Sequence, residues 1–356
     1  GEMNSYKRTG TTSLFSESYR LEKLSKQGDP LERLTKVVEW EYFRDTIEKV
    51  HQKKMVNAGP KPYDPLLMFK ILILQRYYNL SDFQLEYQIL DRLTFCRFLG
   101  LSLNDKVPDE NTIWNFRDKL ISKGIEQELF DKFSSLLEKH GLIAHQGKII
   151  DASFVEAPRQ RNSREKNTQI KEGTPPEEWN DQPNKRRQKD VDARWTKKNN
   201  QSYFGYKNHA KVDNVHKFID TYATTDASVH DSQVLDTLLT EKDQGQDLWA
   251  DSAYTGQEQE NTIKKYKVKN KVHQKGCKNN PLTEVQKESN KEKSKTRARV
   301  EHVFGFMEQS MNKLYIRSIG IKRAIGFVGL VNLTYNLFRY EQVSRLDGIT
   351  MSNWEM

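Results

Sequence analysis

Three acidic residues, far apart in the chain, are the candidates for chemistry. Asp151 ends a short apolar run that begins at Gly147 and contains β-branched residues, which predicts a buried strand. Asp251 ends a second such run, and Glu301 lies beside the apolar stripe of a later helical segment. A carboxylate at the end of a buried strand is costly unless something pairs with it. Taken alone, Asp151 has the simpler alternative of a residue that begins the next turn.

If these carboxylates converged without matching bases, they would repel one another unless hard cations lay between them. Mg²⁺ binds oxygen ligands, through one or two carboxylates together with substrate phosphates. Two such ions about 3.5–4 Å apart activate the attacking oxygen and stabilise the leaving oxygen of an in-line phosphoryl displacement. The residues therefore predict metal-dependent cleavage or joining of nucleic acid.

The net charge of +9 is concentrated in one block of the chain. Residues 261–299 contain 13 Lys or Arg and three acidic residues, so this block alone carries +10. A concentrated basic block favours a polyanionic partner, and nucleic acid is the partner we expect. The alternative is an ordinary solvated basic surface.

Composition excludes several other classes of protein. No uninterrupted apolar run approaches the roughly 18 residues of a membrane span, and the amino terminus lacks an apolar signal segment. We therefore expect a cytoplasmic protein without membrane contact. Two distant cysteines, Cys96 and Cys277, suit a reducing compartment. His273 and Cys277 form half of a zinc site at most, because no second pair follows.

The amino-terminal part predicts an all-helical unit. Residues 1–28 are polar and without period, which indicates a flexible arm, and residues 29–140 show no strand pattern. Cap residues before a proline, and one capping-box pattern, mark helix starts. Helices are expected to begin near Asp29, Asp64 and Ser81 and to cover 109–120 and 125–140.

The helix at 109–120 is the candidate for reading DNA. Its apolar residues face inward, which leaves polar side chains outward. This helix lies in the groove if the region is a helix-turn-helix. In a plain helical bundle the same side chains only meet solvent, and the sequence leaves both readings open. The predicted contacts are Asn111, Thr112, Asn115 and Arg117.

Residues 141–345 predict a mixed α/β domain, with 346–356 as a tail. The expected order is strand, hairpin, helix, strand, helix, strand and helix, which is typical of an α/β layer. Residues 156–201 are polar and predict an extended loop inserted into the domain. A loop that becomes ordered only on binding is the open alternative. One long helix is expected over 283–313, and a closing apolar helix over 324–340.

Five blocks stand in order along the second part of the chain, and two more stand in the helical part. They are Lys148–Ser153, Ala193–Lys198, Tyr203–His209, Trp249–Gly256 and Arg297–Gly305, with Tyr63–Leu67 and Thr112–Arg117 in the helical part. Together these blocks resemble DDE transposases, and more narrowly bacterial insertion-sequence transposases of the family numbered five, related to family four. The resemblance covers about residues 40 to 340. It implies a ribonuclease H-like mixed sheet flanked by helices, preceded by an all-α amino-terminal DNA-binding domain.

The resemblance also implies roles for individual residues. Asp151, Asp251 and Glu301 match the triad that binds two Mg²⁺ ions per active site, with Mn²⁺ as a substitute. Arg297 matches the arginine of a related signature, whose tyrosine and lysine are here Ser294 and Glu308. The resemblance therefore does not imply a DNA-hairpin intermediate.

For Arg297 and Glu301 the alternative is an i,i+4 salt bridge on an exposed helix, worth about 0.2–0.5 kcal/mol. The other expected DNA contacts lie in the catalytic part. Trp195 stacks on an unpaired base or packs on the sheet, and His209 lies near phosphates or is structural. The full set comprises Trp195, Lys207, His209, Lys291, Lys295 and Arg299.

Together these observations predict a bacterial transposase, cytoplasmic and associated with the nucleoid. It would bind the terminal inverted repeats of its element in double-stranded DNA as a synapsed homodimer. It would cleave at the element ends and transfer the 3′-hydroxyl ends into target DNA. The alternatives are a structure-selective nuclease on the same fold and a domesticated DNA-binding protein without catalysis.

Overall fold

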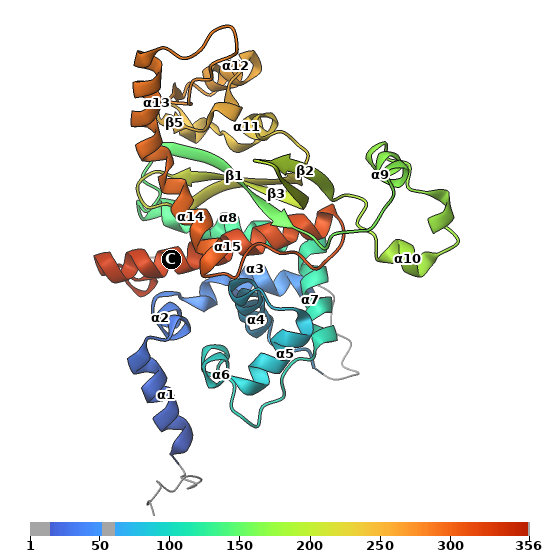
Figure 1. Cartoon of the computed structure of the whole chain (residues 1–356). Helices are drawn as coiled ribbons and strands as arrows, with labels where there is room; N and C mark the ends of the chain where they lie inside the picture. The colour runs from blue at the N-terminus through green and yellow to red at the C-terminus, as the bar shows by residue number, and fades with distance from the viewer. Residues whose placement is uncertain (1–14, 52–60, 355–356) are drawn as a thin grey trace, which may run out of the picture.

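The computed structural model describes residues 15–51 and 61–354. Helices fill the lower part of the molecule in Figure 1 and the sheet lies above them, with helix α15 (Ile321–Asp347) between the two. Every described helix, the 27-residue α15 included, lacks the apolar length of a membrane-spanning segment.

The amino-terminal part is all-helical, as expected. The predicted helix starts are confirmed because the side chains of Asp29, Asp64 and Ser81 accept hydrogen bonds from the first-turn N–H groups. Pro30 and Pro65 occupy the first helical positions. The elements are α1 (Ser16–Gln27), α2 (Pro30–Val37), η1 (Trp40–Phe43), α3 (Arg44–Ile47), η2 (Glu48–His51), α4 (Pro65–Tyr78), α5 (Asp82–Asp91), α6 (Leu93–Leu99), α7 (Glu110–Ser122) and α8 (Ile125–Lys139).

Helix α1 departs from the flexible arm expected over residues 1–28, of which 1–14 lie outside the described residues. No residue of α1 is buried, so the sequence carries no apolar stripe to reveal it. The helix is held from outside: Arg97 Nη1 donates to the Leu21 carbonyl oxygen at 3.3 Å and to Ser25 Oγ at 2.8 Å.

The expected mixed sheet is confirmed. Its order is β4-β3-β1-β5-β6, in which β1 is antiparallel to β3 and parallel to β5, β3 is antiparallel to β4, and β5 is parallel to β6. β2 pairs with the first residues of β3. The strands are β1 (Lys148–Glu156), β2 (Arg194–Lys198), β3 (Gln201–Asp213), β4 (Ile219–Asp226), β5 (Asp247–Trp249) and β6 (Lys269–Asn270).

Gly205 allows β1 and β3 to approach at the end of their pairing. Its φ is +146°, and a Cβ atom there would lie 2.1 Å from the Val155 carbonyl oxygen. Only glycine fits both the backbone conformation and this contact. The glycine thus explains why the block Tyr203–His209 contains no side chain at its third position.

Helices cover both faces of the sheet. Figure 1 shows α8 and α15 below it and α11 and α12 above it. The remaining elements are α9 (Arg164–Lys171), η3 (Glu177–Trp179), α10 (Pro183–Arg187), η4 (Asp231–Val234), α11 (Leu235–Leu238), η5 (Glu241–Asp243), η6 (Ser252–Tyr254), α12 (Gln257–Lys265), α13 (Glu284–Arg297), α14 (Arg299–Gln309) and η7 (Met351–Asn353).

Two hydrophobic cores result. The smaller one lies between the sheet and α11 and α12, and includes Ile150 and Leu248. The larger one runs without interruption from the amino-terminal helices through α15 to the other face of the sheet, and includes Ile149. Across it, the rings of Phe130 on α8 and Tyr222 on β4 lie 4.8 Å apart. The expected boundary near residue 140 therefore runs within one continuous core.

α15 packs closely on its neighbours through two glycines. A Cβ atom at Gly326 would lie 2.4 Å from the side chain of Ile121, and one at Gly329 would lie 2.7 Å from Tyr222 Oη. The Gly329 position also faces Glu126 Cγ at 3.1 Å. The close packing buries Glu126, and its Oε2 atom has no hydrogen-bond partner among the described residues.

Replacing Glu126 with glutamine is expected to stabilise the protein at alkaline pH. Burial raises the pKa of Glu126 from 4.5 to about 7. The folded protein therefore loses stability as pH rises from about 4.5 through 7, because the carboxylate must ionise inside the core. We expect Glu126→Gln to gain about 2 kcal/mol at pH 8, and less toward pH 5. Urea unfolding at both pH values measures this, and an equal effect at both would contradict it.

The insertion at 156–201 is not the extended loop that its composition predicted. It contains α9, α10 and β2, and Figure 1 shows it projecting from the sheet. Trp179 and Ile170 are buried. Asp190, also buried, accepts hydrogen bonds from Tyr206 Oη at 2.8 Å and from the Ala193 amide at 3.0 Å. Single buried residues such as these hold the insertion in place, but they leave no periodic pattern in the sequence.

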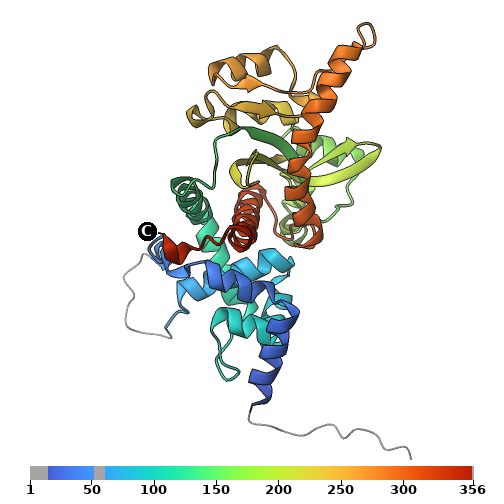
Figure 2. The same cartoon turned by 90° about the vertical axis from the view of Figure 1, so that its left-hand side faces the viewer.

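The long helix expected over 283–313 is two helices, α13 and α14, that meet at Ala298. Figure 2 shows the two helices end to end. α14 buries Val300, Val303 and Met307 against the larger core, whereas no residue of α13 is buried. The two halves therefore experience different surroundings, and the break lies where the buried stripe begins.

Candidate active site

Asp151 lies within β1, and Asp251 follows the adjacent parallel strand β5 by two residues. β1 and β5 pair Ile149 with Trp249, and each aspartate follows two residues later on its own chain. Asp251 caps the short helix η6, because its Oδ1 accepts a hydrogen bond from the Ala253 amide at 2.8 Å. The parallel register therefore brings two carboxylates that are a hundred residues apart to the same edge of the sheet.

The surroundings of Asp151 oppose its ionisation. Burial raises the pKa of this carboxyl group to about 6, and the neighbouring charge of Asp251 acts in the same direction. A hydrogen bond from the Ala152 amide to Oδ1, 2.8 Å long, and the charge of Arg297 act against them. A carboxyl group in this state gains from a further cationic partner.

Arg297 bridges Asp151 and Glu301. It is the last residue of α13, and its Nη1 donates to Asp151 Oδ2 at 3.2 Å while Nη2 lies 3.7 Å from Glu301 Oε1. Glu301, in the first turn of α14, keeps 67% of its side chain exposed. Arg297 Nε is buried and has no hydrogen-bond partner in the described parts of the chain. The i,i+4 pair of Arg297 and Glu301, expected as the simpler alternative, is thus present, and Arg297 also forms an ion pair with Asp151.

The three predicted ligands are brought into one neighbourhood but not into one cluster. Within residues 15–51 and 61–354, no three or more His, Cys, Asp or Glu side chains gather closely enough to hold a metal ion. A guanidinium group instead lies between Asp151 and Glu301. The donors are nonetheless carboxylate oxygens, the ligand type that Mg²⁺ prefers. The carboxylates of Asp151, Asp251 and Glu301 thus fit Mg²⁺ by their chemistry, and their assignment as a metal site stays a prediction.

Two further residues lie near the carboxylates: Tyr254, which was given no role from the sequence, and His273, which was weighed only as half of a zinc site. The Tyr254 hydroxyl is buried without a partner among the described side chains, and burial together with the nearby carboxylates raises its pKa. The His273 amide donates to the Ala250 carbonyl oxygen at 3.0 Å, which extends the pairing of β6 with β5. Burial and the charge of Arg297 lower the pKa of His273. The sequence offered one signal that Tyr254 lies near the site: it follows Asp251 by three residues.

Two of the expected DNA contacts are internal. Lys207 Nζ donates to Asp231 Oδ1 at 2.8 Å and to the Val229 carbonyl oxygen at 2.7 Å. His209 is buried and bonded to Thr225 Oγ1 at 2.8 Å, and burial lowers its pKa to about 4. Both belong to β3, which has neighbours on both edges. The internal partner of His209 favours its structural alternative. Lys207 is likewise engaged inside the protein and is not exposed for a DNA contact.

Helix α7 carries four of the expected DNA contacts, and one of them, Arg117, is not free on its outer face. Asn111 and Asn115 are exposed, and Thr112 is half-buried. Arg117 instead donates through Nη2 to Asp82 Oδ2 at 2.9 Å and through Nη1 to Gln75 Oε1 at 2.8 Å. Its guanidinium holds α7 against α4 and α5, so it does not lie on the outer face with the asparagines.

The remaining candidates are on the surface. Lys291 and Lys295 project from α13, each beside a glutamate three residues earlier. Arg299 Nη1 donates to the Asn214 carbonyl oxygen at 3.0 Å. Trp195 is 39% exposed and packs on Phe204 with ring centroids 5.0 Å apart, so it lies on the sheet while presenting one side to solvent.

Two family models match the chain, and one solved structure is similar to it. Residues 144–337, more than half of the chain, match the family described as "Transposase DDE domain", and residues 19–119 match "Transposase domain (DUF772)". A solved structure, the piggyBac transposase synaptic complex with hairpin DNA, is similar at 12% identity and a TM-score of 0.44. That similarity covers 90% of this chain and 74% of the other. The chain belongs to the family of transposases with a DDE domain, enzymes that transfer DNA strands and generally use divalent metal ions.

Proposed function

We propose that this transposase binds the terminal inverted repeats of an insertion sequence, cleaves DNA at each end and transfers the 3′-hydroxyl ends into target DNA. The observation that carries the proposal is the pair Asp151, within β1, and Asp251, just after the adjacent parallel strand β5, in the part of the chain that matches the family. Membership of the family numbered five remains part of the proposal.

We assign the metal ligands to Asp151, Asp251 and Glu301. Two Mg²⁺ ions, or Mn²⁺ in their place, would supply charge stabilisation for an in-line displacement at phosphorus. Asp151 and Asp251 would hold their oxygens at the end of the sheet, and Glu301 would complete the site. For Glu301 to do so, Arg297 must release the carboxylate of Asp151, and its guanidinium is then available to a phosphate of the substrate.

The proposed partner is double-stranded DNA, bound by a homodimer in a synaptic complex. Lys291, Lys295 and Arg299 are exposed on α13 and α14 beside the candidate site, where they would neutralise backbone phosphates. Asn111 and Asn115 on α7 would reach base edges of the repeat. This division places the sequence-reading surface on the helical part and the chemistry on the sheet.

Cleavage and joining assays test the proposal against its two rivals. The substrate is a duplex that carries an end of the element encoding this chain, supplied intact or already cut, with Mg²⁺, Mn²⁺ or EDTA. We expect metal-dependent cleavage of the intact end and covalent joining of the cut end to a second duplex. Cleavage without any joining would identify a nuclease. A gel shift with neither reaction would identify a non-catalytic DNA-binding protein.

A further inference from the structure

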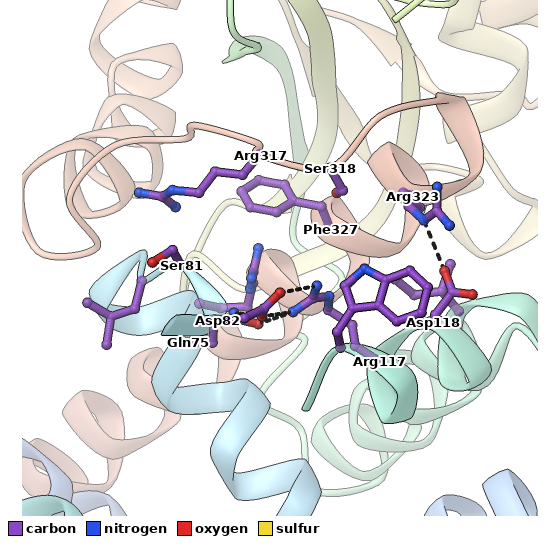
Figure 3. Close-up of a pocket in the computed structure, with 13 residues that line it drawn as sticks. Gln75, Ser81, Asp82, Arg117, Asp118, Arg317, Ser318, Arg323 and Phe327 are labelled. Atoms are coloured by element: carbon purple, nitrogen blue, oxygen red, sulfur yellow. Dashed lines mark hydrogen bonds and ion pairs between the residues drawn. The ribbon is translucent and has the colours of Figure 1, made fainter. Parts of the chain in front are cut away.

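A basic pocket lies between the helical part of the molecule and the segment that leads into α15. Its volume is about 170 Å³, which is room for several water molecules at about 30 Å³ each, or for one tetrahedral anion. Figure 3 shows Arg317 and Ser318 on one side of it and Ser81, Asp82 and Arg117 on the other. Four arginines line this arginine pocket: Arg76, Arg117, Arg317 and Arg323.

Arg76 is the residue that the fold leaves unexplained. It is 8% exposed, and its Nε has no hydrogen-bond partner among the described residues. Its guanidinium carbon lies 4.6 Å from the ring centroid of Phe327. Burial, with the neighbouring charges of Arg117 and Arg317, lowers the pKa of Arg76 to about 9, although the charge of Asp82 acts in the opposite direction. A buried cation without a hydrogen-bonded anionic partner is costly, so the site is incomplete as it stands.

The other charges in the pocket do not supply that partner. Arg117 is paired with Asp82, and Arg323 Nε donates to Asp118 Oδ1 at 2.9 Å, as Figure 3 shows. Arg317 is exposed and bonded to the neutral side chain of Asn79 at 3.0 Å. Among the described side chains, four arginines thus face two aspartates, and the surplus lies on Arg76 and Arg317.

Two unpaired guanidinium groups, with the hydroxyls of Ser81 and Ser318 beside them, suit one class of ligand. Arginine presents its N–H groups in a planar fork that matches the oxygens of a phosphate. Hydroxyl groups donate to the remaining oxygens. The chemistry of the pocket is therefore that of a phosphate group, either free or part of a polymer.

The surroundings favour a polymer. Arg317 also lines a neighbouring cavity of about 620 Å³ that extends to Ser153 and Phe154 on β1. These two residues in turn line a third cavity, of about 230 Å³, beside Lys197 and Lys198. Neighbouring cavities in this series thus share lining residues, from the arginine pocket to β1, the strand that carries Asp151. The middle cavity is also lined by Glu156 and Glu308, so a phosphate is held at the arginine pocket and not there. A free phosphate ion needs no neighbouring cavities, whereas a DNA backbone extends beyond one phosphate.

We infer that the arginine pocket binds a phosphate of the DNA backbone, on the path between the helical part and the active site. The inference rests on the proposed function, because DNA is the substrate there. It adds a second anchor for the same strand, remote from the basic surface of α13.

Two variants test the pocket, and a third is their control. Arg317→Ala removes the exposed guanidinium, and Arg76→Gln removes the buried one; Arg20→Ala, on the exposed face of α1, makes the same charge change outside the pocket. Each full-length variant is measured for DNA affinity between about 50 and 200 mM salt, and for thermal unfolding with inorganic phosphate. Circular dichroism checks folding, and Arg317→Ala carries the test if Arg76→Gln does not fold.

Arg317→Ala is expected to weaken DNA binding roughly tenfold and to lower the slope of log affinity against log salt by about one. Phosphate should raise the unfolding temperature of wild type and Arg20→Ala more than that of the pocket variants. Unchanged DNA affinity with loss of the phosphate effect would assign the pocket to a free phosphate and overturn the inference, as would no change in either. Metal-dependent cleavage by wild type, measured in parallel, shows whether the proposed function itself stands.

Discussion

Asp251→Asn is expected to lower the rate of DNA cleavage on the order of a thousandfold while leaving the fold intact. Asparagine keeps the oxygen that accepts the hydrogen bond from the Ala253 amide, so the cap of η6 survives. It loses the negative charge that a divalent ion requires. A metal contributes several kcal/mol of transition-state stabilisation, and each 1.36 kcal/mol is tenfold in rate, so a loss of about 4 kcal/mol gives this effect.

The measurement is the rate of Mg²⁺-dependent cleavage of end-containing DNA under single-turnover conditions. Asp247→Asn is the matched control, because Asp247 begins the same strand and undergoes the same chemical change. Binding of the DNA should be retained in both variants. If Asp251→Asn cleaves as fast as Asp247→Asn, Asp251 is not a metal ligand and the assignment of the site fails.

Lys211→Met is expected to lower the free energy of unfolding by about 3–5 kcal/mol. Lys211 is fully buried on β3, and its Nζ contacts Asp243 Oδ2 at 2.6 Å and Asp220 Oδ2 at 3.6 Å. Asp243 is itself only 1% exposed. Methionine fills a similar volume but leaves buried carboxylate charge without its cation, and this is the costly way to break a buried pair.

Urea unfolding followed by circular dichroism measures the change. Lys265→Met provides the comparison, because Lys265 forms a pair with Asp236 at a similar distance, 2.7 Å, but both side chains are more than half exposed. An exposed pair of this kind contributes at most about 1 kcal/mol. Equal losses in the two variants would mean that the buried network around Lys211 is not structural.

Much of the architecture could be predicted because its signals are local. Helix starts at Asp29, Asp64 and Ser81 depend on a side chain bonding to an amide two or three residues away. The apolar runs before Asp151 and Asp251 predicted strands, and strands β1 and β5 are present, although β1 continues past Asp151 to Glu156 and β5 ends two residues before Asp251. Parallel pairing of those strands then follows from the alternation of strands and helices, and the observed register agrees with it.

The features that escaped prediction depend on partners distant in the chain. Arg117 looked like an outward-facing residue of α7, yet its partner Asp82 lies 35 positions earlier. His209 is bonded to a threonine 16 positions later, on the next strand. Arg297 lies between Asp151, 146 positions earlier, and Glu301, next to the break at Ala298 that separates two helices whose sequence reads as one. Helical spacing predicts the i,i+4 pair of Arg297 and Glu301, but it does not predict the contact between Arg297 and Asp151.

Helix α15 has a consequence for how precisely the enzyme could work. One of its sides lies on the amino-terminal helices and another on the sheet, and Gly326 and Gly329 remove the side chains that would have kept it apart from Ile121 and Tyr222. Within the described residues, one continuous core joins the amino-terminal helices to the sheet through α15. Under the proposed function, the packing of α15 then sets the number of base pairs between the recognised sequence and the scissile bond.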